Sequence, residues 1–193
     1  MLAELAPLWS GLPRDATLLD VGVGMGDIPA RARVAAARHG VRLTTLGVDS
    51  VPALAAASRD RGLEVICADA RAIPLPDRSI DVVTCSQVLH HFFDGDLTLV
   101  LRELDRVARA RVIVSDLRRS RLAAAGIWLA SFAFGFHPVS RHDGVVSVMR
   151  GFREAELRTL VRSAVGQDPH IRSRAVARVT ATWAPGRPVS GGT

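Results

Sequence analysis

The sequence predicts a three-layer α/β/α domain around a mostly parallel seven-stranded sheet whose last strand is antiparallel. Short apolar runs alternate with Ala- and Arg-rich segments of helical length as far as Ser115, and this alternation is typical of a parallel sheet covered on both faces. The first run leads into a glycine-rich turn, as in nucleotide-binding sheets. The chain ends in an alternating segment, which favours an antiparallel pair at one edge of the sheet.

Five apolar runs predict the parallel strands. They are Thr17–Val21, Leu43–Val48, Glu64–Ala68, Ile80–Cys85 and Arg111–Ser115. Each is short and carries few polar residues, which is typical of strands that are buried on both faces.

The segments between these strands predict helices. They are Asp27–His39, Val51–Arg61 and Asp96–Arg109. Pro29 falls in the first turn of the first helix, where its missing N–H leaves no hydrogen bond unmade. Gly40 and Gly62 follow the first two helices, as glycines commonly do at helix C-termini.

The last third of the chain changes character. We expect a helix over Arg119–Phe134, an irregular segment over Gly135–Gly151, a helix over Arg153–Ala164, and two paired strands or one bent strand over His170–Trp183. The apolar stretch Leu122–Phe136 is shorter than the roughly 20 residues of a membrane span. It therefore predicts a buried or lid-forming helix and no transmembrane segment, with contact to a membrane surface as the alternative.

The domain boundaries follow from composition. Hydrophobic residues make up 48% of the chain and charged residues 23%, the balance of a globular protein. We expect one domain over residues 1–184, followed by a flexible tail over residues 185–193, whose sequence PGRPVSGGT is linker-like. The N-terminus shows no basic region before a long apolar run, which predicts a cytoplasmic protein.

Charge and cysteine usage disfavour two classes of partner. The net charge is +6 and every cationic residue is an arginine, but the arginines are scattered, whereas nucleic-acid binders concentrate charge in a stripe. Cys67 and Cys85 have neither disulfide-framework nor metal spacing. We therefore expect two reduced thiols and no metal, and nucleic acid is disfavoured as a partner.

The glycine-rich turn is the strongest functional signal. Gly22, Gly24 and Gly26 follow the first predicted strand and open the first helix, so the backbone can approach a ligand that a Cβ would block. The spacing is G-x-G-x-G and departs from the dinucleotide fingerprint. Asp20 precedes the glycines, where a carboxylate suits a ligand with an ammonium group and repels phosphates.

Two further carboxylates end the next strands. Asp49 lies where a carboxylate hydrogen-bonds ribose hydroxyls, although it could also cap the helix that follows, as could Ser50. Asp69 could accept from an exocyclic adenine amine, and Ala70 could offer its backbone N–H. Acidic residues at three consecutive strand ends predict a nucleoside site at the carboxyl edge of the sheet.

These motifs resemble those of class I S-adenosylmethionine-dependent methyltransferases. The matching segments are LLDVGVGMGD, GVDS and CADARAIPLPDRSIDVVTCSQVLHHF, within Thr17–Asp116. The resemblance implies a Rossmann-like methyltransferase fold and S-adenosylmethionine as cofactor. It implies cofactor-binding roles for Asp20, Gly22, Gly24, Gly26, Asp49, Ser50, Asp69, Ala70 and Ser86.

Two shorter motifs bear on the acceptor. Leu89–Phe92 is similar to ubiquinone- and menaquinone-biosynthesis methyltransferases and to small-molecule O-methyltransferases. His142–Val148 resembles enzymes encoded beside type III polyketide synthases, which methylate phenolic products. Cys85–Val88 stands where amino-methylating enzymes carry Asn-Pro-Pro-Tyr. The resemblance therefore implies methyl transfer to a small lipophilic aromatic or polyketide-like acceptor, at a phenolic oxygen.

A phenol has a pKa near 10 by analogy with tyrosine and needs a base near neutral pH. His91 and His142 are the candidate catalytic residues, because one follows the fourth strand and the other lies in the irregular segment. A lipophilic pocket is expected from Ile127, Trp128, Phe132, Phe134 and Phe136, which could equally be core residues. A second copy of the chain is a candidate partner.

Three alternatives remain open at this stage: C-methylation of a quinone precursor, methylation of RNA, and a cofactor-binding subunit without catalysis. Sixteen residues precede the first predicted strand, which suggests a site more open than in related enzymes. We expect weak activity unless a second chain, a longer N-terminus or Gly135–Gly151 covers the site.

Overall fold

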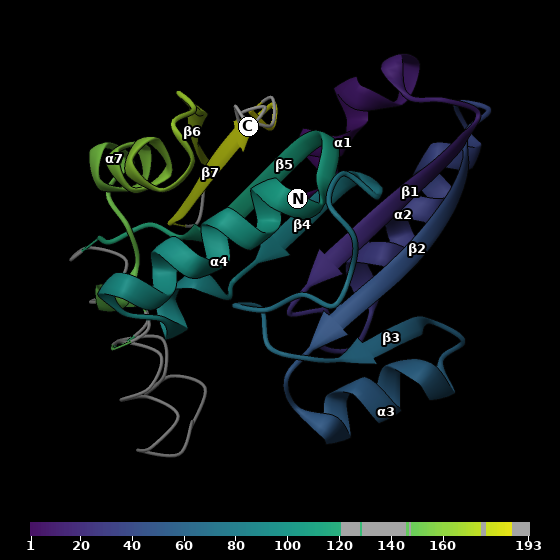
Figure 1. Ribbon diagram of the computed structural model, residues 1–193, viewed down its shortest axis with the longest axis horizontal. Helices are drawn as coiled ribbons and strands as arrows, with labels where there is room; N and C mark the ends of the chain where they lie inside the picture. Colours follow the sequence, from purple (N-terminus) through teal and green to yellow (C-terminus); the bar gives the residue numbers. More distant parts are fainter. Residues whose placement is uncertain (121–127, 129–145, 147, 175–176, 187–193) are drawn as a thin grey trace, which may run out of the picture.

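The computed structural model describes residues 1–120, 128, 146, 148–174 and 177–186. Its centre is a seven-stranded sheet in the order β3-β2-β1-β4-β5-β7-β6 (Figure 1). The strands are β1 Asp15–Val21, β2 Arg42–Asp49, β3 Glu64–Cys67, β4 Ile80–Ser86, β5 Ala108–Leu117, β6 His170–Arg174 and β7 Arg178–Trp183. β1 to β5 pair in parallel, whereas β7 is antiparallel to β5 and to β6. The predicted fold class is confirmed, and His170–Trp183 forms two paired strands.

Helices cover both faces of the sheet. They are α1 Leu2–Leu5, the 3-10 helix η1 Ala6–Gly11, α2 Asp27–Ala37, α3 Pro52–Asp60, the 3-10 helix η2 Leu89–His91, α4 Asp94–Val107 and α7 Glu154–Val165. In Figure 1, α4 lies in front of the sheet and α2 behind it. α7 packs beside α4, and α1 and η1 contact α2.

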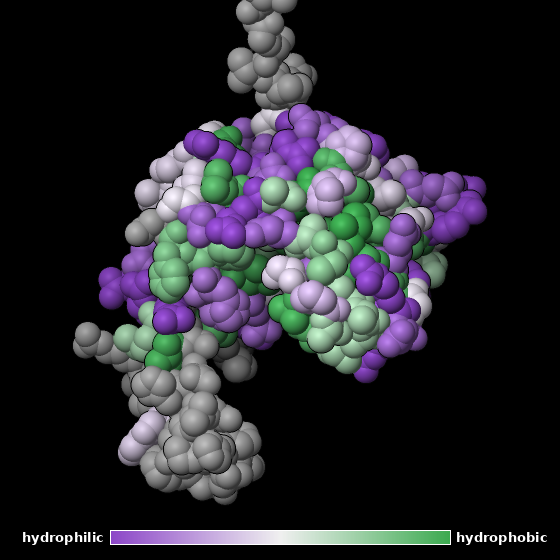
Figure 2. Space-filling model, turned by 60° about the horizontal axis from the view of Figure 1, so that its bottom comes forward, coloured by the Kyte–Doolittle hydropathy of each residue, from purple (hydrophilic) through white to green (hydrophobic). Residues whose placement is uncertain are grey.

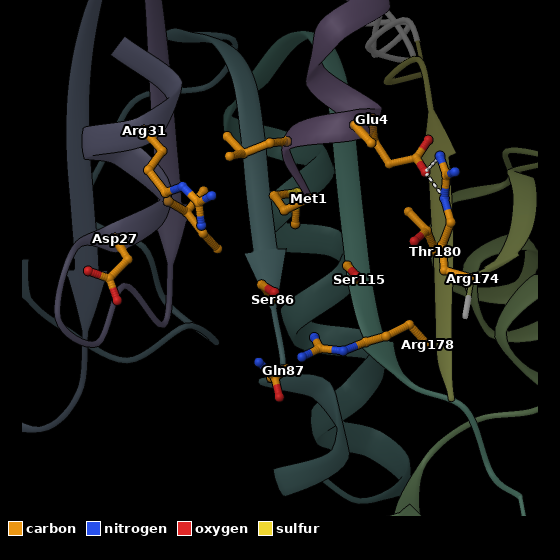
Figure 3. Close-up of a pocket in the computed structure, with 13 residues that line it drawn as sticks. Met1, Glu4, Asp27, Arg31, Ser86, Gln87, Ser115, Arg174, Arg178 and Thr180 are labelled. Carbon is orange, nitrogen blue, oxygen red and sulfur yellow. Dashed lines mark hydrogen bonds and ion pairs between the residues drawn. The ribbon is translucent and has the colours of Figure 1, made fainter. Parts of the chain in front are cut away.

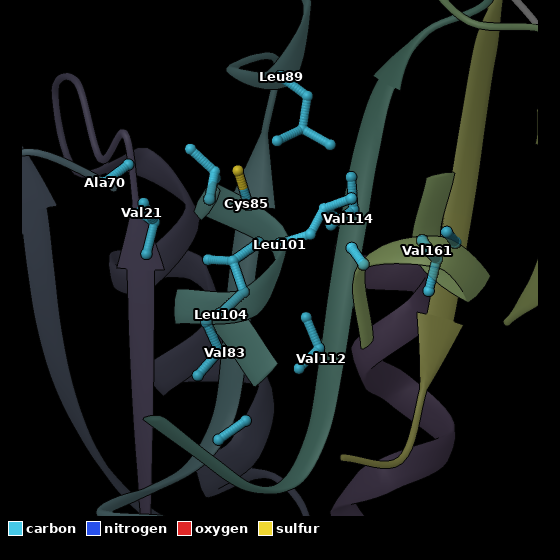
Figure 4. Packing of buried hydrophobic residues seen from close by; sticks show 14 of the residues in the cluster. Val21, Ala70, Val83, Cys85, Leu89, Leu101, Leu104, Val112, Val114 and Val161 are labelled. Atoms are coloured by element: carbon cyan, nitrogen blue, oxygen red, sulfur yellow. The ribbon is translucent and has the colours of Figure 1, made fainter. Parts of the chain in front are cut away.

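The side chains of the central strands alternate between two cores, because successive residues of a strand point to opposite faces. Val83 and Val112 pack under α4 and α7 in the larger core, which also contains Leu101 and Leu104 of α4 (Figure 4). Their neighbours Val82 and Ile113 join a second core with Leu5, Trp9 and Leu18, on the face that α2 covers. Burial on both faces explains why the middle strands read as continuous apolar runs.

Several predicted boundaries shift by one to three residues. β5 is longer than the predicted Arg111–Ser115, because it lies between β4 and β7 and has ladder partners along both sides. α4 ends at Val107 instead of Arg109, because Ala108 already pairs with Ile80 in the sheet. These differences leave the order of elements unchanged.

The predicted helix over Arg119–Phe134 lies almost wholly outside the described residues. The same is true of residues 187–193 of the tail predicted over residues 185–193, and of His142. Of the aromatic residues expected to form a lipophilic pocket, Trp128 is described and is 49% exposed. Within the described part of the chain, no helix is long and apolar enough to cross a membrane.

The two cysteines are free, as predicted. Cys67 ends β3 and is exposed, whereas Cys85 lies in β4 and is buried. Strands β2 and β1 separate them in the sheet. Desolvation raises the pKa of the Cys85 thiol well above its ordinary value, so this cysteine is a packing residue.

Candidate active site

The glycine-rich turn lies at the carboxyl end of β1. The backbone amides of Gly22 and Val23 donate to the Val48 carbonyl, at 2.7 Å and 3.1 Å. Gly22, Gly24 and Gly26 all have positive φ, at 72°, 53° and 77°, in the region that disfavours residues with a Cβ. The turn therefore depends on glycine at each position.

Asp49 fastens this turn to the end of β2. Its Oδ2 accepts from the amide of Gly24 at 2.9 Å, and its Oδ1 accepts from the amide of Val51 at 3.0 Å. The carboxylate therefore holds the start of α3 as well as the glycine turn. Ser50 makes no capping bond, since Val51 is the N-cap residue of α3 and no side chain caps that helix.

A cavity of about 390 Å³ opens beside the glycine turn; we call it the glycine-loop cavity. Six residues predicted as site residues line it: Gly22, Gly24, Asp49, Ser50, Ala70 and His91. The other lining residues are Val51, Leu54, Ala68, Gln87, Val88 and Phe92. Figure 2, which brings the bottom of Figure 1 forward, shows a notch in this face of the molecule with hydrophobic side chains among those that border it.

Four predicted site residues do not line this cavity. Asp69 binds Arg71 at 2.6 Å and is partly exposed. Gly26 precedes α2 and lies against Leu63 and Ser58. Asp20 is buried beneath the turn, and Ser86 faces a second cavity.

Asp20 is a buried carboxylate with one polar neighbour. It is 1% exposed, and its Oδ1 accepts from the hydroxyl of Thr84 at 2.7 Å. Burial raises the pKa of Asp20 to about 7, helped by the nearby charge of Asp49 and opposed by the Thr84 hydrogen bond. A cationic group bound close to Asp20 would favour its ionised form.

Replacing Asp20 with asparagine is expected to affect stability and cofactor binding in opposite directions. The unfolded chain ionises near pH 4 while the folded protein keeps the proton up to about pH 7. Asp20 therefore supports the fold at low pH, and this support is lost as pH rises through 7. Relative to the wild type, the free energy of unfolding of Asp20→Asn should therefore increase by about 2 kcal/mol as the pH rises from 5 to 8.

The same variant should bind S-adenosylhomocysteine about tenfold more weakly at pH 8, because a neutral amide cannot form an ion pair with an ammonium group. Urea unfolding at the two pH values and calorimetry measure these effects. The exposed Asp60, changed to asparagine, is the control. Equal affinity in Asp20→Asn and wild type would remove Asp20 from the cofactor site.

A second cavity, of about 480 Å³, lies on the α2 face of the sheet; we call it the arginine cavity. Its walls come from α1, α2, the ends of β4 and β5, and β6 and β7, and they include Arg31, Arg174 and Arg178 (Figure 3). Gln87 lines both cavities, so they adjoin at this residue. Gln87 has a φ of 59°, and such strain in a non-glycine residue is concentrated at functional sites.

The histidines after β4 form a small cluster. His90 is buried, and its Nδ1 lies 2.7 Å from Oδ1 of Asp116. The rings of His90 and His91 are 4.1 Å apart between centroids. Desolvation lowers the pKa of His91, and the adjacent His90 lowers it further. His91 is therefore neutral near pH 7 and able to accept a proton.

Three functional candidates were missed by the sequence analysis: Gln87, the His90–Asp116 pair and Arg178. Asp116 left a usable signal, because it is an acidic residue at the end of a fifth strand. Gln87 left none, since its backbone conformation is not visible in the sequence. Among the described residues, no group of three His, Cys, Asp or Glu side chains could hold a metal ion.

The comparison with protein families decides the identity. Residues 19–114, which carry the glycine turn, Asp49 and the end of β4, match the family described as a methyltransferase domain. The chain belongs to the class I S-adenosylmethionine-dependent methyltransferases. It is an enzyme of this type, and its cofactor is S-adenosylmethionine.

Solved structures similar to this methyltransferase share its fold at low sequence identity. A chain from the complex of the Haloferax volcanii Trm112 methyltransferase activator with a methyltransferase aligns over 96% of this chain and 89% of its own length, at 14% identity and a TM-score of 0.64. An S-adenosylmethionine-dependent methyltransferase from Aquifex aeolicus aligns over 95% and 93%, at 15% identity and 0.64. The magnesium protoporphyrin IX methyltransferase from Synechocystis, with bound S-adenosylhomocysteine, aligns over 95% and 80%, at 16% identity and 0.60.

The residues of the methyltransferase fit this cofactor. A Cβ added to Gly24 would meet nothing within 4 Å, so the turn leaves space where a ligand can approach the backbone. The buried carboxylate of Asp20 suits a cationic group. Asp49 lines the cavity, and each of its oxygens, which accepts one backbone amide, has a second lone pair for a hydroxyl donor.

Replacing Asp49 with alanine is expected to weaken S-adenosylhomocysteine binding by roughly 1–3 kcal/mol, since ribose hydroxyls would lose a charged acceptor. The variant should also unfold at a lower temperature, because the Gly24 and Val51 amides lose their acceptor. Calorimetry and thermal unfolding measure both. Asp60→Asn again serves as control, and unchanged affinity in Asp49→Ala would exclude Asp49 from the ribose site.

Proposed function

We propose that this methyltransferase methylates a phenolic oxygen of a small, lipophilic aromatic or polyketide-like acceptor in secondary metabolism. The observation that carries the proposal is His91, whose pKa is lowered by desolvation and which lines the glycine-loop cavity with Gln87. A phenol must lose its proton to attack, and a neutral imidazole at this place is a suitable base.

The neighbours of His91 support this role. Asp116 accepts from the backbone amide of Leu89 at 2.9 Å, as well as contacting His90. Because a carboxylate only accepts, Nδ1 of His90 is the donor in their hydrogen bond. Asp116 thereby fixes the His90 ring, and the His90 ring packs against His91. His90 and Asp116 are positioning residues in this proposal.

The cofactor supplies an already activated methyl group on its sulfonium, so the protein need only bind, align and exclude water. In the proposal Gly22, Gly24 and Gly26 let the backbone approach it, and Asp20 faces its ammonium group. Asp49 and Ser50 bind the ribose, Ala70 binds the adenine, and Ser86 lies near the methionyl end. Asp69 would join Ala70 by exchanging its ion pair with Arg71 for the adenine amine. His142 stays a predicted second base outside the described residues.

Labelled S-adenosylmethionine and mass spectrometry of products test the proposal. The acceptor panel contains simple phenols, hydroxylated aromatic acids, quinone precursors and RNA. We expect label on a phenolic oxygen. Such a product has lost its free hydroxyl and therefore resists further methylation at that oxygen. Label on a carbon atom or on RNA, with the phenols unlabelled, would contradict the proposal.

A further inference from the structure

The arginine cavity carries cationic groups that the methyl-transfer chemistry does not use. Its polar wall is made by Ser86, Ser115 and Thr180, which project from β4, β5 and β7. Arg31 of α2 enters from one side, and Arg178 of β7 from the other (Figure 3). Hydroxyls and guanidinium groups together form a surface suited to an anion.

The acidic residues of the cavity wall are already paired. Glu4 accepts a hydrogen bond from Nε of Arg174 at 2.7 Å. Asp27 lies 3.5 Å from Arg61 outside the cavity and is largely exposed. In the described part of the chain, the side chains of Arg31 and Arg178 make no hydrogen bond or ion pair, so two positive charges are left facing the cavity.

Arg178 is the better placed of the two. It is half-buried, whereas Arg31 is exposed. Figure 3 shows its guanidinium reaching across the end of β5 towards Ser86 and Gln87. It therefore ends beside the residue at which the two cavities adjoin. A guanidinium that is partly withdrawn from water and has no counter-charge is costly unless a ligand supplies one.

We propose that Arg178 binds a carboxylate in the arginine cavity, next to the methyl-transfer site. The planar guanidinium donates two parallel hydrogen bonds to a carboxylate, and Arg31 adds positive charge from the opposite wall. The favoured source is the acceptor, which, if the proposed function holds, is then a hydroxylated aromatic acid. The other source of the same chemistry is the methionyl carboxylate of the cofactor.

Binding measurements separate the two sources. Calorimetry compares S-adenosylhomocysteine with 5′-methylthioadenosine, which lacks the amino-acid part. In the presence of S-adenosylhomocysteine, it then compares 4-hydroxybenzoate with 4-hydroxybenzamide, which keeps the phenol and loses the charge. The variants are Arg178→Gln and Arg178→Lys, and the control is Arg38→Gln, which removes an exposed arginine from the end of α2.

We expect Arg178→Gln to weaken 4-hydroxybenzoate binding about 10-fold to 100-fold and to leave 4-hydroxybenzamide unchanged. Arg178→Lys should lose less, since it keeps the charge. Weaker binding of S-adenosylhomocysteine alone, with 5′-methylthioadenosine unchanged, would assign the carboxylate to the cofactor. If Arg178→Gln binds both 4-hydroxybenzoate and S-adenosylhomocysteine with affinities within about twofold of wild type, the proposal is overturned.

Thermal unfolding shows whether each variant is folded. If Arg178→Gln does not fold, Arg178→Lys still tests the proposal. The binding readout does not depend on turnover. A methyltransferase that binds the acid through Arg178 but never methylates a phenol would refute the proposed function and leave the carboxylate site standing.

Discussion

Replacing His91 with alanine is expected to lower turnover about 100-fold or more, the contribution typical of a general base. The imidazole lines the glycine-loop cavity, and desolvation lowers its pKa. It is therefore neutral near pH 7, where a phenol is still protonated. Affinity for S-adenosylhomocysteine should change much less than turnover, because the ribose and ammonium partners proposed for the cofactor are untouched.

The pH profile gives this prediction its second readout. An imidazole acts as a base only when it is neutral. The lowered pKa of His91 therefore predicts that wild-type turnover falls only at pH values below the ordinary pKa of histidine. His90→Ala should move this acid limb of the pH profile to higher pH, because it removes one cause of the lowered pKa of His91. His39→Ala, at the far end of α2, is the control. Near-normal turnover in His91→Ala would show that the acceptor arrives ionised or that positioning alone suffices.

Two glycines of the same turn are expected to fail for different reasons. In Gly22→Ala the new Cβ would lie 2.2 Å from Cγ2 of Val88, and the β-branched valine has few rotamers to escape into. Together with the positive φ, this clash should cost about 3 kcal/mol of stability or more. In Gly24→Ala the Cβ meets nothing within 4 Å, so this variant should fold but bind the cofactor poorly.

Gly40→Ala is the matched control, because Gly40 also has a positive φ, at 74°, and open space around its Cβ. It isolates the backbone strain, which is about 1–2 kcal/mol. Urea unfolding and calorimetry with S-adenosylhomocysteine then separate the two effects. Normal cofactor affinity in Gly24→Ala would show that the cofactor does not approach the turn at this residue.

Much of the glycine-loop cavity could be predicted from the sequence. Gly22, Gly24 and Asp49 lie together because a strand that ends in glycines, and the next strand that ends in a carboxylate, bring their carboxyl ends to one edge of a parallel sheet. That rule depends only on the alternation of strands and helices, which apolar periodicity reveals. Asp69 followed the same rule, but its side chain turns to Arg71, and a local ion pair of this kind is not encoded in periodicity.

The arginine cavity and the histidine cluster could be identified only in the tertiary structure. Arg178 is far from Gln87 in the chain, and they approach because β7 inserts antiparallel beside β5. Asp116 reaches His90 because β5 lies next to β4. The sequence thus determined the methyltransferase fold and the glycine turn, whose signals are local. The sheet order decided which distant side chains face one another, because it is set by the packing of the whole domain.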